Sequence, residues 1–95
     1  MKELAELRQE LDQLDREIVA LFEQRMAVSR QVAQYKLVHG LPVLDRSREA
    51  QVIESRTAML ADASLSPALR TFFETVMALS RDAQEAYLRE VRGDA

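Results

Sequence analysis

Apolar residues recur every three or four positions along the first third of the chain. Residues 4 to 38 contain neither glycine nor proline. A heptad-type spacing kept over more than four repeats predicts one long helix, a rod of roughly 50 Å, with an apolar seam along one face. The seam consists of Leu4, Leu7, Leu11, Leu14, Ile18, Leu21, Val28, Val32 and Tyr35, with Arg25 in the place of one apolar residue.

The seam is too long for a single molecule to cover. A compact domain of about 100 residues has a radius of gyration of only about 13 Å. The pattern therefore predicts that a second copy of the chain packs on the seam, in an intertwined helical-bundle homodimer.

Caps and helix breakers place two further helices, at residues 46–62 and 67–91. The signals are Gly40 and Pro42 after the first helix, Asp45 as the cap of the second, and Ser66 as the cap of the third with Pro67 at its first position. The residues expected to face inward are Val52, Ile53, Met59 and Leu60 on the second helix and Leu69, Phe72, Phe73, Val76, Met77, Tyr87 and Leu88 on the third. We therefore predict an all-α fold with three helices, in a single domain over residues 1–95.

Composition limits the chemistry available to this chain. There is no cysteine, which excludes disulfides and thiolate metal sites, and His39 has no second imidazole with which to bind a metal. The net charge of −3 argues against nucleic-acid binding. The first residues resemble no signal peptide, and no apolar run is long enough for a membrane span. We expect a soluble, cytoplasmic protein without a metal.

Two cations on the long helix stand out against its apolar pattern. Arg25 occupies a seam position, where a buried guanidinium needs an anion, supplied either by the protein or by a ligand. A buried salt bridge or a register-setting role would also explain Arg25. Lys36 lies eleven residues further on, close to three helical turns, and so shares its face. Arg8 flanks the seam roughly 25 Å before Arg25, so that only an antiparallel partner helix would bring it to the same place.

The two shorter helices add polar side chains to the same interior. Ser80 and Gln84 are spaced i, i+4 within the apolar face of the third helix, where they bond to each other, to water or to a ligand. Asp45, Arg48 and Glu49 form a row on the second helix, which a helix cap followed by an exposed ion pair would also explain. Together with the cations, these groups describe a pocket for a compact polyanion.

These residues give the chain a resemblance to the all-α class of chorismate mutase, especially its bacterial three-helix, domain-swapped dimers. The resemblance covers residues 4 to about 91 and is carried by four segments: LRQELDQLDREIVALFEQR (7–25), VAQYK (32–36) before the HGLPV turn, DRSRE (45–49) and SRDAQ (80–84). It implies the intramolecular pericyclic (Claisen) rearrangement of chorismate to prephenate in phenylalanine and tyrosine biosynthesis, with no cofactor. Such an enzyme holds the reactive conformer and stabilises the charge that develops on the breaking ether oxygen.

The resemblance also implies a role for each polar residue. Arg25 and Arg8 of the partner subunit would clamp the two carboxylates, while Lys36 would bind a carboxylate and the ether oxygen and Gln84 would donate to that oxygen. Glu49 and the backbone of Asp45 would hold the ring hydroxyl, Ser80 would contact the ring carboxylate, and Arg48 would position its neighbours.

Two other functions compete with this interpretation. An isochorismate–pyruvate lyase shares the fold and the Arg, Arg, Lys, Gln core, but the short turn at 39–44 and the row at 45–49 look more like the mutases. A non-catalytic dimerisation module has no use for Arg25, Ser80 and Gln84 in its interior.

Overall fold

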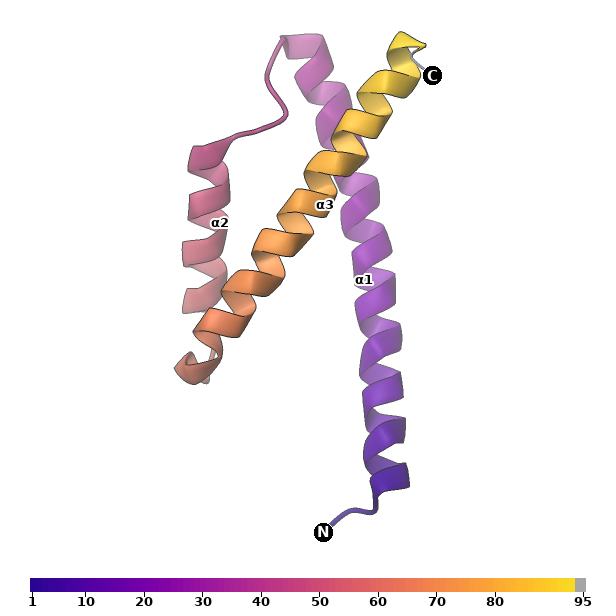
Figure 1. Ribbon diagram of the computed structural model, residues 1–95, viewed down its shortest axis with the longest axis vertical. Helices are drawn as coiled ribbons and strands as arrows, with labels where there is room; N and C mark the ends of the chain where they lie inside the picture. Colours follow the sequence, from indigo (N-terminus) through magenta and orange to yellow (C-terminus); the bar gives the residue numbers. More distant parts are fainter. Residues whose placement is uncertain (94–95) are drawn as a thin grey trace.

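The computed structural model describes residues 1–93, and this part of the chain folds into three α-helices and a short 3₁₀ helix, without a strand (Figure 1). The elements are α1 (Leu4–His39), α2 (Arg46–Ala58), the 3₁₀ helix η1 (Ala63–Leu65) and α3 (Ser66–Arg92). α3 packs against both α1 and α2. The predicted all-α fold with a very long first helix is confirmed. Within the described residues, no helix has a stretch long and apolar enough to cross a membrane.

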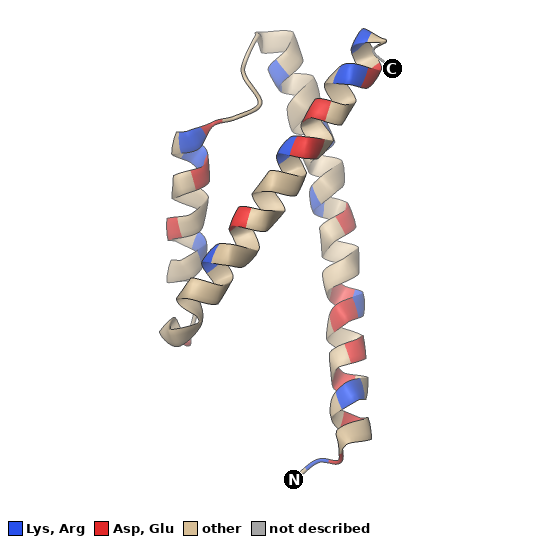
Figure 2. Ribbon diagram, in the orientation of Figure 1, with Lys and Arg blue, Asp and Glu red and all other residues tan. Residues whose placement is uncertain are grey.

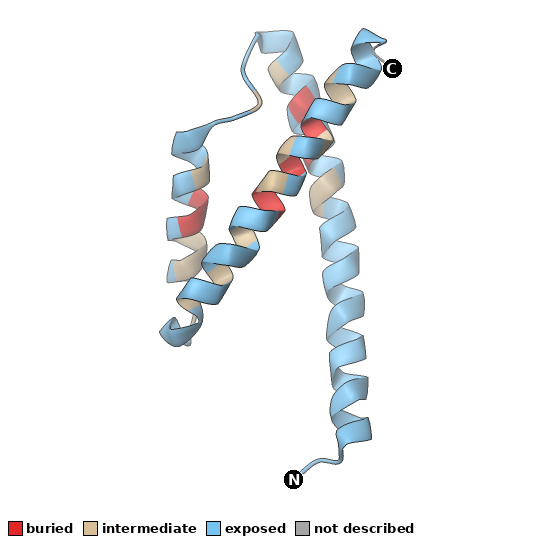
Figure 3. Cartoon of the chain, viewed as in Figure 1, coloured by how far each residue is buried: buried red, intermediate tan, exposed pale blue. Residues whose placement is uncertain are grey.

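The N-terminal part of α1 extends away from the rest of the chain. Every residue from 1 to 24 is exposed (Figure 3), including Leu11 at 57% and Ile18 at 53%. The buried residues of α1 are Ser29 and Ala33, where it meets α3. The radius of gyration is 16.9 Å, against about 13 Å for a compact domain of this size. The seam is thus formed, but no other part of residues 1–93 covers it.

The small core lies where α3 meets α2. Val52, Ile53 and Met77 form its centre, and the partly buried Phe73 packs against them. Two residues expected to face inward are instead exposed, Met59 at 74% and Phe72 at 50%. Met59 follows the end of α2. The ring of Phe72 stands edge-on to that of Phe73, and it is Phe73 that packs on the core.

The turn between α1 and α2 follows the sequence signals. Gly40 caps α1 in the left-handed conformation, with φ at 65°, which glycine adopts without steric cost. The Asp45 side chain accepts a hydrogen bond of 3.0 Å from the backbone N–H of Arg48 and so caps α2. Both predicted caps are confirmed.

The connection from α2 to α3 differs from the prediction. α2 ends at Ala58 and not at residue 62, because Asp62 accepts hydrogen bonds from the backbone and side chain of Ser64 and starts η1. Such local side-chain bonds compete with the helix. α3 begins at Ser66, with Leu65 as its cap residue and no side-chain capping bond, so the predicted Ser66 cap was wrong.

Candidate active site

All three helices contribute to a cavity of about 270 Å³. Its walls come from the C-terminal half of α1, the start of α2 and the middle of α3. The cavity is lined by seven of the eight predicted site residues: Arg25, Lys36, Asp45, Arg48, Glu49, Ser80 and Gln84. Residues up to 59 positions apart in the sequence therefore share one small volume.

Arg25 carries an uncompensated charge in this cavity. Desolvation lowers the pKa of its guanidinium, and the nearby cations Arg56 and Arg48 lower it further. Among the described residues, no carboxylate forms an ion pair with it. An arginine stays protonated under all ordinary conditions, so this half-buried charge favours the binding of an anion. The buried salt bridge considered for Arg25 is absent from the described part of the chain.

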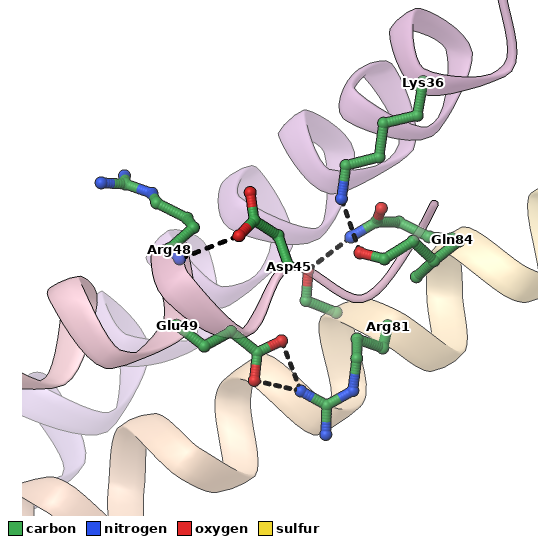
Figure 4. Close-up of polar contacts among 8 residues, drawn as sticks. Lys36, Asp45, Arg48, Glu49, Arg81 and Gln84 are labelled. Carbon is green, nitrogen blue, oxygen red and sulfur yellow. Dashed lines mark hydrogen bonds and ion pairs between the residues drawn. The ribbon is translucent and has the colours of Figure 1, made fainter. Parts of the chain in front are cut away.

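Lys36 is held toward the cavity by the chain that follows α1. Its Nζ donates a hydrogen bond of 2.6 Å to the backbone carbonyl of Val43, in the turn that leads to α2 (Figure 4). A carbonyl oxygen accepts this bond without neutralising the ammonium charge. Two of the three ammonium protons remain for other acceptors.

A chain of hydrogen bonds fixes the amide of Gln84. The hydroxyl of Ser29 lies 3.0 Å from the carbonyl oxygen of Arg25, to which it donates its single proton. Ser80 lies 2.6 Å from Ser29 and must therefore donate to it. Ser80 can then only accept from Gln84, whose Nε2 lies 3.4 Å away. This order assigns the amide orientation, which leaves one N–H of Gln84 available and its buried Oε1 without a partner among the described residues.

Another wall of the cavity comes from the start of α2, with its cap residue Asp45 and with Arg48 and Glu49. The carboxylate of Asp45 is engaged in the cap, and the guanidinium of Arg48 donates to Gln51 at 2.8 Å, pointing away from Lys36 and Gln84 (Figure 4). Glu49 pairs with Arg81 of α3 at 2.5 Å. Asp45 therefore caps α2, as the alternative interpretation of this row expected. The ion pair of Glu49, however, is not an exposed pair on one helix: it joins α2 to α3 and is half-buried.

The net charge of the residues that line the cavity is opposite in sign to the net charge of the whole chain. Of the described residues that line it, four are cations and two are carboxylates, a net charge of +2, whereas the whole chain carries −3. The reason lies in the distribution along α1, whose acidic residues all precede residue 24 (Figure 2). A cavity with this sign of potential concentrates small anions.

A sequence model of the family described as chorismate mutase type II matches residues 7–85. The chain belongs to this family.

The relatives that the chain matches differ in length. The chain is 37% identical over 90 residues to the T-protein of Haemophilus influenzae, covering 95% of this chain but only 22% of that protein. It is 24% identical over 93 residues to the chorismate mutase of Methanocaldococcus jannaschii, covering 97% of this chain and 94% of the relative. A conserved hypothetical protein from Pyrococcus furiosus has a similar structure, with a TM-score of 0.72 and 30% identity over 85% of this chain and 93% of that one.

The eighth predicted site residue, Arg8, does not line the cavity. It is exposed on the N-terminal part of α1, about 25 Å along the helix from Arg25. Its assignment to the site of a partner subunit stays a prediction.

Two polar residues of the cavity were not predicted from the sequence. Ser29 lies one turn after Arg25, and together with Ala33 it forms a small-residue face on which α3 packs closely; this i, i+4 spacing was a usable signal. Arg81 directly follows Ser80 and so does not lie on the helix face that Ser80 and Gln84 share. Its pairing with Glu49 depends on how α2 packs against α3, which no local pattern specifies.

The hydroxyl chain predicts an energetic coupling between Ser29 and Ser80. Either serine-to-alanine substitution leaves a buried hydrogen-bonding group without its partner, so the double variant should lose about 1 kcal/mol less stability than the sum of the two single losses. Urea unfolding at one protein concentration measures all four proteins. In the control cycle, Ser55→Ala replaces Ser29→Ala, since the Ser55 hydroxyl donates within α2, and additivity is expected there. If the stability losses of Ser29→Ala and Ser80→Ala are additive as well, the assigned hydrogen bond between the two hydroxyl groups is contradicted.

Proposed function

We propose that residues 1–95 form a single domain that rearranges chorismate to prephenate. The observation that carries this proposal is the unpaired charge of Arg25 in the cavity that also holds Lys36 and the free N–H of Gln84. Chorismate is a dianion with an ether oxygen between its two halves. A half-buried cavity with a net charge of +2 is complementary to it.

The proposed catalysis needs only binding and electrostatics. Arg25 holds one carboxylate, and the compact conformer that fits the cavity brings the two reacting carbon atoms together. Lys36 and Gln84 donate hydrogen bonds to the ether oxygen, on which negative charge grows as its bond to carbon breaks. Both donors are already oriented, Lys36 by Val43 and Gln84 by Ser80, so little reorganisation is required in the transition state.

The remaining residues of the cavity bind the ring. In this proposal the Ser80 hydroxyl turns its proton from Ser29 to the ring carboxylate when the substrate binds. Glu49 accepts a hydrogen bond from the ring hydroxyl, which the backbone at Asp45 also holds. Arg48 adds positive charge at the cavity wall and positions its neighbours; its proximity already lowers the pKa of Arg25.

We also propose that the protein is a homodimer whose two sites each use both chains. An apolar groove of about 580 Å³ lies between α1 and α3, lined in part by Ile18, Phe22, Phe72 and Leu79. The groove ends at Arg25, which also lines the cavity. The exposed seam of a second α1 has the chemistry to fill it, and in an antiparallel arrangement this seam would bring Arg8 of the partner subunit to the substrate.

Turnover measurements test the proposed function. The purified protein should consume chorismate and release prephenate, and Lys36→Met should lower kcat by about a hundredfold or more, because it removes a preoriented donor to the ether oxygen. Arg89→Met removes the same charge from an exposed position on α3 and should leave kcat unchanged. An increase in KM alone for Lys36→Met would restrict the lysine to ground-state binding. Absence of wild-type turnover would contradict the proposed function.

Sedimentation tests the proposed assembly. The chain has a mass of 10.8 kDa, and micromolar solutions should contain particles of twice that mass, since isolated exposure of the apolar seam is unfavourable. Leu11→Glu together with Ile18→Glu places charges on the seam and should shift the mass toward that of the monomer. A folded, active monomer would contradict the shared site.

A further inference from the structure

Arg81 forms an ion pair with Glu49 across the boundary between α3 and α2. Its Nη1 lies 2.5 Å from both carboxylate oxygens of Glu49 (Figure 4). The two side chains are only 32% and 26% exposed, so water screens this pair less than a surface salt bridge. Charge-assisted bonds of this kind fix the position of the carboxylate. Both residues line the cavity.

The ion pair changes which groups Glu49 recognises. An isolated carboxylate attracts a cation strongly, because two full charges interact directly. The charge of Glu49 is already compensated by Arg81, while its oxygens keep lone pairs that accept hydrogen bonds. A neutral hydroxyl group fits this arrangement. An ammonium group in the same place would lie beside the positive charge of Arg81.

The rest of the cavity offers an ammonium group little compensation. Asp45 supplies the other carboxylate among the described lining residues, and its Oδ1 is engaged in capping α2. Arg25, Lys36 and Arg48 add further positive charge. The binding of a charged ring substituent therefore depends mainly on the Glu49–Arg81 pair.

We propose that Arg81 makes the site selective for a hydroxyl group over an ammonium group on the substrate ring. The inference rests on the proposed function, in which the ring hydroxyl of chorismate donates to Glu49. Arg81 acts as a positioning residue, because it sets the charge and the orientation of Glu49, which holds the ring hydroxyl.

Two substrates that differ at this ring position test the inference. Chorismate carries a hydroxyl group, and its 4-amino-4-deoxy analogue carries an amine that is largely protonated at pH 7. The ratio of kcat/KM for the two compounds should favour chorismate in the wild type. Arg81→Gln keeps a hydrogen-bond donor without the charge and should shift this ratio toward the amine by about tenfold or more. Arg81→Met repeats the measurement with an apolar side chain.

Charge-retaining and remote variants are the controls. Arg81→Lys keeps the positive charge, so its ratio should stay close to that of the wild type. Arg30→Gln removes an arginine from another interhelical pair, with Glu90 at 3.0 Å, outside the residues that line the cavity, and should leave the ratio unchanged. Circular dichroism establishes that each variant is folded.

The outcomes separate this inference from the function on which it rests. An equal loss of kcat/KM for both substrates in folded Arg81→Gln and Arg81→Met would overturn it, because a purely structural role predicts that result. A shift of the ratio in Arg81→Lys as large as in Arg81→Gln would overturn it too, since charge would not be the cause. A wild type inactive toward chorismate would refute the proposed function itself.

Discussion

The length of α1 is the constraint on which the other features of this protein depend. A helix of 36 residues is about 54 Å long, and α3 packs on its C-terminal half (Figures 1 and 3). Its other half exposes an apolar seam next to an apolar groove. The C-terminal segment thus contributes to the cavity, while in the proposed homodimer the N-terminal segment packs on the partner chain and completes its site. In that proposal, each binding site is built from two chains.

The cavity depends on charge that the protein does not neutralise by itself. Partial burial makes the charge of Arg25 costly for the folded chain, as the lowered pKa of its guanidinium records. In the proposed function, a bound dianion offsets this cost, and Lys36 and Gln84 stabilise the negative charge that grows on the ether oxygen. The hydroxyl chain from Gln84 to Ser29 and the ion pair of Arg81 with Glu49 hold the neutral and anionic groups in place around these cations.

Much of this arrangement could be predicted from the sequence, because it follows from periodicity and caps. The spacing of Leu4 to Tyr35 predicted α1, and Gly40 and Asp45 predicted the turn. Seven of the eight proposed site residues, chosen as polar groups within or beside the apolar faces, line one cavity. The errors arose where tertiary packing decides: α2 stops early because Asp62 bonds to Ser64, and Phe72 is exposed. Arg81 could not have been predicted, since its partner Glu49 lies 32 positions away on another helix.

The central claim, that each site combines groups from two chains, is tested most directly by mixing inactive variants. Arg8→Ala and Gln84→Ala should each abolish most turnover. When the two are unfolded together and refolded, random pairing should restore about a quarter of the wild-type activity, since half of the dimers are mixed and each mixed dimer has one complete site. Arg25→Ala mixed with Gln84→Ala is the matched control; both residues line the same cavity of one chain, so no activity should return. Failure of the first mixture despite demonstrated mixed dimers would contradict the shared site and place Arg8 in its own chain.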